Sequence, residues 1–327
     1  MRSGRTLLEN RSKNFARFSW GVLTFTLMVV LWGAYVRASG SGAGCGNHWP
    51  LCNGEVVPAS PGVQTIIEFT HRAMSGIDGV LILILLAWAV WIFPRSHPAR
   101  LGASLSFVFL VTEALIGAAL VKLEQVAQNA SVGRAWSLSG HLINTLGLLA
   151  CLALTAWWAG GGSRLDWRSR KWALIVPSIL LIILTGVSGA IAALGDTLFP
   201  VSSLAAGFRQ DFDPAANVFL RLRLYHPFLA AATGVWLAFY AIRTATQTAR
   251  AKPYARCLLA LVVIQVGAGA LNLLLLAPVW MQMVHLLLAD LLWISLVLLA
   301  ASILQEVSQT DAIPETIYLR SASETAH

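Results

Sequence analysis

Charged side chains are scarce in this sequence. Asp, Glu, Lys and Arg together make up 12% of its 327 residues, whereas 57% of the residues are hydrophobic. A soluble domain carries about 25% charged residues, so the composition excludes an ordinary soluble globular protein. The composition instead indicates a protein that lies in a membrane.

Cysteine is also scarce. The four cysteines include no C-x2-C pair, which is the spacing typical of structural zinc sites. Cys45 and Cys52 lie seven positions apart, with only His48 between them as a further metal ligand, so a metal site on this pair is disfavoured. Cys151 and Cys257 lie within apolar stretches and are most simply explained as buried thiols.

Long apolar runs are abundant. About 20 consecutive apolar residues suffice for a helix to cross a bilayer, and the sequence contains eight such runs. They cover residues 18–37, 64–93, 101–121, 136–158, 172–194, 217–242, 255–277 and 280–304. The first run follows a basic leader, as in a signal peptide, but it is too long for an h-region and lacks a small-x-small cleavage site. We therefore predict an all-α integral membrane protein with eight transmembrane helices.

The distribution of Lys and Arg predicts the orientation. Sixteen of these residues fall in the two terminal segments and the even-numbered loops, against six on the opposite side. Because basic loops stay in the cytoplasm, we expect residues 1–17 and the C-terminus to be cytoplasmic in a cell membrane. The net charge of +8 reflects this bias, so no nucleic acid partner is needed to explain it. The polar tail, residues 305–327, has no apolar period and is expected to be disordered.

The same orientation places the Gly-rich segment Gly40–Glu55 in the first outer loop. Disulfides persist outside the cytoplasm. We therefore expect a Cys45–Cys52 disulfide in this loop.

The eight runs divide into two halves. Residues 160–171 form a short, Gly-rich, basic linker between residues 18–159 and residues 172–304. Glu113 and Gly117 in the third run correspond to Gln265 and Gly269 in the seventh. An even number of spans gives both halves the same orientation, as in parallel repeats. We predict two pseudo-symmetric four-helix bundles, a natural site for cofactors.

Four histidines occupy matching places in these halves. Each lies a few residues into an even-numbered run, near the outer face: His71, His141, His226 and His285. One such histidine is most simply a polar residue that bonds to a neighbouring helix. Four at similar depth, two in each half, instead predict two bis-His haem sites, His71 with His141 and His226 with His285.

Glycines recur at corresponding positions in the odd-numbered runs. They would allow a porphyrin face to pass close to the helix, although close helix packing explains any one of them equally well. These glycines are Gly33, Gly117, Gly189 and Gly269.

The two halves differ beside their histidines. Glu68 precedes His71 by one helical turn, whereas Arg223 stands at the corresponding place in the second half. A half-buried Glu can move protons or stabilise a positive charge, although a carboxylate favoured by the helix dipole is the simpler explanation. Arginines suit haem propionates, so Arg221 and Arg223 are candidate propionate ligands. We therefore expect the first half to be reactive and the second to be structural or electron-transferring.

Further polar residues lie near these sites. Arg72, beside His71, is another candidate ligand for a propionate. Asn144 lies one turn below His141 and is either close to the haem site or simply bonded to another helix. Asp78 and Glu113 lie deeper in the second and third runs, where they could relay protons. Asp290 has no assigned role.

Together these features resemble the haem A synthase family over nearly the whole chain. The shared features are the eight spans in two halves, GSGAGC and HWPLCNGE in the first outer loop, EFTHR at the start of the second span, and histidines that open the fourth, sixth and eighth spans. The family converts haem O to haem A for terminal cytochrome oxidases, by oxidising a ring methyl to a formyl group through successive hydroxylations.

The resemblance implies roles for individual residues. His71 and His141 would face the substrate haem O, with Glu68 as the catalytic carboxylate, and His226 and His285 would hold a haem b. Implied partners are a haem O synthase, cytochrome oxidase assembly and an electron acceptor that the sequence does not name.

In the family, the cysteine pair of the first outer loop forms a disulfide tied to function, which corresponds here to Cys45 and Cys52. Some members carry a second pair in the third outer loop, but residues 195–216 contain no cysteine. An electron relay that needs both pairs is therefore not expected in this chain.

Two alternatives remain open. A di-haem b-type membrane cytochrome explains the four histidines equally well, although it does not explain Glu68 opposite Arg223, or the outer cysteine pair. A transporter built from parallel repeats would place its polar groups at the membrane midplane, whereas here they cluster near one face.

Overall fold

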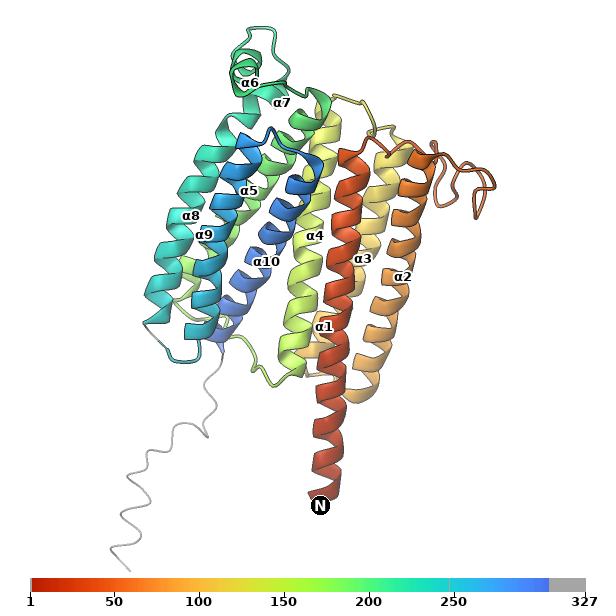
Figure 1. Cartoon of the computed structure of the whole chain (residues 1–327). Helices are drawn as coiled ribbons and strands as arrows, with labels where there is room; N and C mark the ends of the chain where they lie inside the picture. Colours follow the sequence, from red (N-terminus) through yellow and green to blue (C-terminus); the bar gives the residue numbers. More distant parts are fainter. Residues whose placement is uncertain (1, 247, 306–327) are drawn as a thin grey trace, which may run out of the picture.

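The computed structural model describes residues 2–246 and 248–305, with side chains from residue 10 onward. The described part is helical, and eight of its helices or helix pairs are long and apolar enough to cross a membrane. The predicted all-α fold with eight spans is therefore confirmed. The predicted disordered tail lies, from residue 306 on, outside the described residues. The helices are α1 Arg2–Ala38, α2 Val63–Ile92, α3 Pro98–Lys122, α4 Val132–Ala159, α5 Trp172–Leu198, α6 Leu204–Asp211, α7 Val218–Arg223, α8 Tyr225–Ala245, α9 Lys252–Leu274 and α10 Val279–Leu304 (Figure 1).

The long helices pack in two groups. Helices α1 to α4 contact one another, and α5, α8, α9 and α10 form the second group (Figure 1). α4 and α10 lie at the centre. In an apolar 18-residue segment of each, 67% and 61% of the residues are buried, against 11% in α3 and α9. The Trp293 indole of α10 donates to the Leu146 carbonyl of α4 at 2.8 Å. Because α1 and α4 also contact α5 and α10, the halves share a continuous core, and the two pseudo-symmetric bundles stay a prediction.

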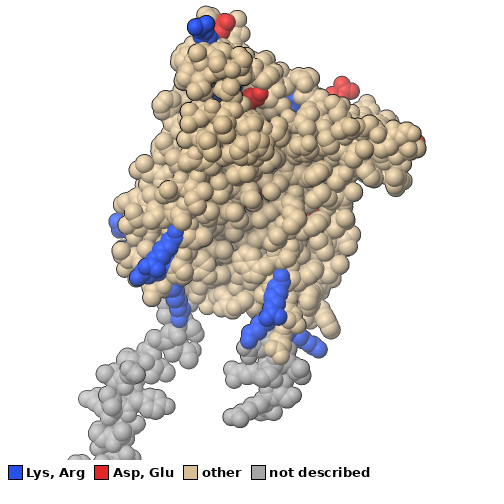
Figure 2. All heavy atoms as spheres, viewed as in Figure 1, with Lys and Arg blue, Asp and Glu red and all other residues tan. Residues whose placement is uncertain are grey.

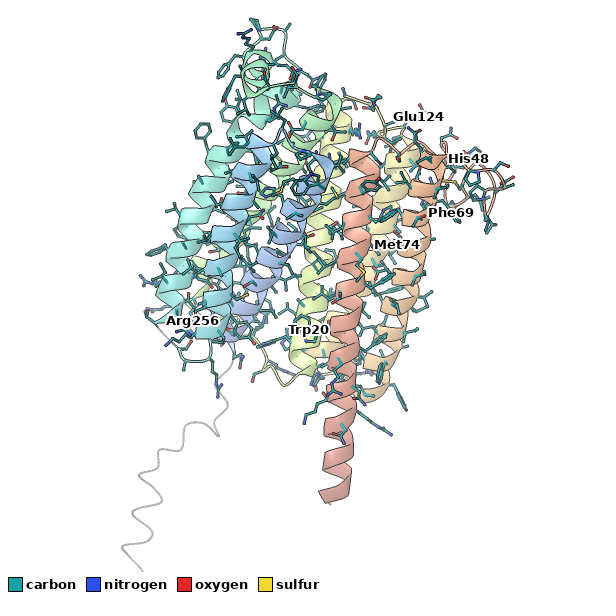
Figure 3. All side chains as sticks on the ribbon, in the orientation of Figure 1. Trp20, His48, Phe69, Met74, Glu124 and Arg256 are labelled. Carbon is teal, nitrogen blue, oxygen red and sulfur yellow. A yellow bond between two sulfur atoms is a disulfide. The ribbon has the colours of Figure 1, made fainter. Side chains whose placement is uncertain are left out.

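One end of the helix assembly carries residues 39–62, the connection between α1 and α2, and we call it the loop end (Figure 1). His48 and Glu124 lie at the loop end, whereas Arg256 lies at the opposite end (Figure 3). On the face drawn in Figure 2, most of the Lys and Arg side chains gather at the end opposite the loop end. This is the asymmetry on which the predicted orientation depends.

Three features of the helices differ from the expectations. α1 spans Arg2–Ala38, so the helix continues through the segment expected only as a cytoplasmic N-terminus. The run 217–242 corresponds to one candidate span, Val218–Ala245, whose helix is interrupted at Leu224 between α7 and α8. Pro227 has no N–H to donate to the preceding turn, which explains why the helix does not run through. α6 was not predicted.

Candidate functional site

The Gly-rich segment folds back onto the start of α2. Cys45 and Cys52 form a disulfide, and both side chains are buried. A Cβ on Gly44 would lie 2.4 Å from the backbone carbonyl of Gln64, so only glycine allows the loop to approach α2 this closely. The Thr65 hydroxyl donates to the Gly44 carbonyl at 2.7 Å. These contacts therefore hold the loop against the start of α2.

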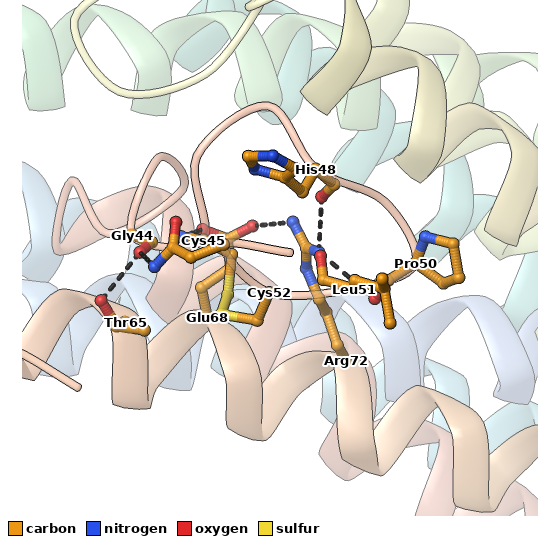
Figure 4. Close-up of polar contacts among 10 residues, drawn as sticks. Gly44, Cys45, His48, Pro50, Leu51, Cys52, Thr65, Glu68 and Arg72 are labelled. Carbon is orange, nitrogen blue, oxygen red and sulfur yellow. Dashed lines mark hydrogen bonds and ion pairs between the residues drawn. A yellow bond between two sulfur atoms is a disulfide. The ribbon is translucent and has the colours of Figure 1, made fainter. Parts of the chain in front are cut away.

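Glu68 of α2 also binds this loop, and only 4% of the residue is exposed. Its Oε2 accepts a hydrogen bond from the backbone N–H of Cys45 at 2.9 Å, and its Oε1 accepts from Arg72 at 2.6 Å (Figure 4). Arg72 in turn donates to the carbonyls of His48 and Leu51, both at 2.7 Å. Because Glu68 is the sixth residue of α2 and bonds to the loop, the simple helix-dipole explanation does not account for its contacts.

The four predicted histidines lie at similar depth in four of the spans. His71 lies on α2, His141 on α4, His226 on α8 and His285 on α10. All four lie in the half of their helices nearest the loop end. The pairing of these histidines around a haem stays a prediction.

Three of these imidazole rings rest on glycines of odd-numbered spans. A Cβ on Gly33 of α1 would lie 2.8 Å from Cε1 of His71. The corresponding distances are 2.9 Å for Gly189 to His226 and 3.0 Å for Gly269 to His285. Gly117, by contrast, has no described atom within 4 Å of its Cβ position. Three of the four predicted glycines therefore contact a histidine ring.

The four rings differ in what faces Nδ1. The Nδ1 atoms of His71 and His285 are buried with no hydrogen-bond partner among the described residues. Nδ1 of His226 lies 2.9 Å from the Ser188 hydroxyl. Nδ1 of His141 is likewise buried without a hydrogen bond among the described residues, and it lies 3.3 Å from Oε2 of Glu113.

Arg223 and Arg221 both lie at the loop end of the second half. The Arg223 guanidinium donates to Asp196 at 2.7 Å and to Asp211 at 2.5 Å, so it is already neutralised by two carboxylates. Arg221 is exposed and donates to the Pro214 carbonyl at 2.5 Å. Glu68 and Arg223, which correspond in the two halves, are thus each held by groups of opposite charge.

Sequence reasoning missed Arg37, which links the halves. From the last turn of α1 it donates to Ala193 and Thr197 of α5, at 2.9 and 3.0 Å, and to Oε1 of Gln282 in α10, at 3.1 Å. Arg37 lies one turn beyond Gly33, and Gln282 lies one turn before His285. This spacing is the signal that could have revealed it.

Arg134 of α4 was likewise not singled out. It is 3% exposed and donates to the carbonyls of Ala127 and Asn129, at 2.7 and 2.8 Å, while its Nε has no partner in the part of the chain that is described. Arg37 and Arg134 also interact electrostatically with each other. The loop end therefore holds two largely enclosed cations that the sequence did not assign.

The residues present fit a haem better than a bare metal ion. Across residues 2–246 and 248–305, no group of three or more His, Cys, Asp or Glu side chains is placed to hold an ion. Paired imidazoles are sufficient for haem iron. Glycines that leave room beside three of the rings suit the same ligand.

Comparison with known proteins agrees with this geometry. Residues 16–297 match the model of the COX15-CtaA family, described as cytochrome oxidase assembly protein. The chain belongs to this family. The likeness to haem A synthases noted in the sequence is thereby confirmed at the level of the family.

Relatives of this chain carry two names. A Thermus thermophilus protein named Protoheme IX farnesyltransferase is 46% identical over 294 residues, which is 89% of this chain and 48% of the relative. Proteins named Heme A synthase from Exiguobacterium sibiricum and Bacillus mycoides are 41% identical over 104 residues and 50% identical over 95 residues. These matches cover 32% and 29% of this chain, and 35% and 30% of the two relatives. The chain spans about half the length of the Thermus relative.

Proposed function

We propose that this protein is a haem A synthase, a membrane oxidoreductase that oxidises a ring methyl of haem O to a formyl group by successive hydroxylations. In this proposal, His71 and His141 hold the substrate haem O. His226 and His285 hold a haem b. The observation that carries the proposal is one difference between the two similar histidine sites. The first alone has a disulfide-bearing loop fixed to a carboxylate, Glu68, one turn from its histidine.

Glu68 is the proposed catalytic carboxylate. Oxidation of a methyl group passes through an electron-poor carbon, which an adjacent carboxylate stabilises. Each hydroxylation takes its oxygen from water, releases protons and passes two electrons to an acceptor. Although both oxygens of Glu68 accept a hydrogen bond here, each carboxylate oxygen offers two lone pairs. Glu68 therefore retains the capacity to take a proton from an incoming water.

The loop-end arginines are the proposed ligands of the propionates. Arg221 is exposed and can turn toward one. Arg72 and Arg223 already bind carboxylates of the protein, so each would exchange a partner to bind a propionate. The haem iron supplies the redox chemistry, while these side chains orient the ring.

The proposed setting is the plasma membrane, with both termini cytoplasmic and the loop end outside. The asymmetry of Lys and Arg supports this orientation. The Thermus relative supports a link to haem farnesylation, because it is named for that reaction and includes a region like this chain. A haem O synthase would supply the substrate, and cytochrome oxidase assembly would use the product.

Mass analysis of haem extracted from the purified full-length protein tests the proposal. The protein is expressed together with a haem O synthase. Haem A or hydroxylated haem O in the extract supports synthesis. Haem b alone favours the di-haem electron carrier, for which the similar histidine sites are the supporting observation. Absence of a Soret band excludes both and favours the transporter.

A further inference from the structure

His141 is the one predicted haem ligand whose Nδ1 faces a carboxylate in the described structure. Glu113 lies on α3, and its Oε2 is 3.3 Å from Nδ1 of His141. The Glu113 side chain is 19% exposed and lies within a membrane span. Ionisable groups inside a span are costly and usually functional. Glu113 therefore needs an explanation beyond packing.

Other groups hold this carboxylate in place. Asn144 donates to Oε2 at 2.6 Å, and the Thr145 hydroxyl donates to Oε1. Thr112 donates to the Asn144 amide oxygen at 2.6 Å, which turns the amide nitrogen toward Glu113. These donors fix the position of both carboxylate oxygens. Asn144, which the sequence left between two roles, thus supports Glu113.

The second half has no such charge. Gln265 of α9 occupies the position that corresponds to Glu113, and its Oε1 is buried with no hydrogen-bond partner in the described part of the chain. Gly269, one turn beyond Gln265, lies against His285, whereas Gly117, one turn beyond Glu113, contacts no described atom. The His141 ring is therefore placed toward the carboxylate, and the His285 ring toward a glycine.

In this structure Nδ1 of His141 and Oε2 of Glu113 approach to 3.3 Å without forming a hydrogen bond. We propose that Glu113 is a positioning residue that accepts the Nδ1–H of His141 once a haem holds the ring. This contact leaves Nε2 of His141 as the iron ligand and makes it a stronger donor, as carboxylate–histidine pairs do for other metals. A stronger donor stabilises the oxidised iron and lowers the midpoint potential of the haem in the first site. The inference rests on the proposed function only in placing a haem between His71 and His141.

Replacement of Glu113 by Gln tests this inference in the purified, haem-loaded full-length protein. Gln matches Glu in shape and reproduces the residue of the second half. In a spectroelectrochemical titration, we expect one haem to shift to a more positive potential and the other to stay unchanged. At a fixed potential, the ratio of oxidised to reduced iron in the first site should fall about tenfold, which corresponds to about 59 mV for one electron. The g values of the oxidised low-spin haem should shift with it.

Asp78→Asn is the matched control. Asp78 is a buried carboxylate of α2 that bonds to Thr26 at 2.9 Å. The control should leave the g values at their wild-type positions. Gly33→Ala identifies which haem belongs to the first site, because it disturbs His71. Unchanged potentials and g values in Glu113→Gln would overturn the inference, as would an equal change of g values in Asp78→Asn.

Glu113→Asp provides a second variant if Glu113→Gln does not fold. It keeps the charge but withdraws the carboxylate, so the potential should shift in the same direction by a smaller amount. Equal midpoint potentials in Glu113→Asp and the wild type would then contradict the proposal. A failure of the proposed function gives a different result. The extract of the wild type then contains no haem A, while the shift in midpoint potential of Glu113→Gln can still be measured.

Discussion

Gly33 of α1 lies directly against the imidazole of His71 in α2. A Cβ at position 33 would stand 2.8 Å from Cε1 and 3.1 Å from Nε2 of that ring. Carbon atoms in contact prefer separations of about 3.5–4.0 Å. The histidine can keep its place only while position 33 has no side chain.

Gly33→Ala should therefore weaken haem binding in the first site. Overpacking costs about 1–3 kcal/mol, which corresponds to a loss of affinity of about fivefold or more. Haem content per protein, measured by the pyridine haemochrome spectrum, should fall toward one haem.

Gly117→Ala is the control, because no described atom lies near its Cβ position. Gly269→Ala should produce the corresponding loss in the second site, where the Cβ would lie 3.0 Å from His285. Full haem content in Gly33→Ala, or equal losses in Gly33→Ala and Gly117→Ala, would contradict the interpretation of these glycines.

Glu68→Gln should retain both haems and stop formation of the formyl group. The amide keeps an acceptor for the loop but neither carries the negative charge nor takes up a proton. Removal of a general base typically lowers a rate by about 10²–10⁴-fold. The measurement is the ratio of haem A to haem O in the extract.

Glu55→Gln is the control for Glu68. Glu55 is exposed on the same loop and accepts from the Ala59 N–H at 2.9 Å. It should leave the haem ratio unchanged. Normal haem A output from Glu68→Gln would remove Glu68 from the proposed chemistry.

Loss of the disulfide should loosen the loop of residues 39–62 beside the first site. A disulfide contributes about 2–4 kcal/mol, and the Cys45 N–H also fixes Glu68. In the variant with both Cys45→Ala and Cys52→Ala, we expect faster proteolysis of residues 39–62 and reduced turnover. Retained haem with reduced turnover would indicate a redox role, whereas loss of haem would indicate a structural one.

Cys151→Ala is the control for the disulfide, because Cys151 is a free cysteine within α4. It should leave the proteolysis rate of the loop unchanged. If the loop resists protease equally with and without the disulfide, its attachment depends on Glu68 and Arg72 alone.

Arg37→Gln should destabilise the contact between the two groups of helices. Arg37 donates to three groups in α5 and α10, and hydrogen bonds from charged groups contribute about 1.5–3 kcal/mol each. We expect a lower Tm in detergent, measured by tryptophan fluorescence. Arg243→Gln, an exposed position at the end of α8, should leave Tm unchanged.

Part of the site was predictable from spacing alone. Equal depth in helices that run in the same direction predicts the pairing of His71 with His141, and of His226 with His285. The proximity of Glu68 to His71 follows from one helical turn. Contacts within a turn, and depth in the membrane, are local properties of a sequence.

Other parts of the site depend on which faces of two helices meet. His141 and Glu113 are 28 positions apart, and Arg37 and Gln282 are 245 apart. No periodicity specifies such contacts. The contacts of Arg223 with Asp196 and Asp211, 27 and 12 positions away, are likewise beyond the reach of a pattern.

The amino-acid sequence by itself determined the eight spans and the asymmetry of charge between the ends. It also determined the recurrence of His and Gly at corresponding positions. These properties depend on local hydrophobicity and helical period, which tertiary contacts do not alter. Only the tertiary structure decided that Glu68 holds the loop, that Glu113 faces His141 and that Arg37 joins the two groups. Each is a contact between separate segments of the chain, which forms because buried polar groups must find partners where neighbouring segments supply them.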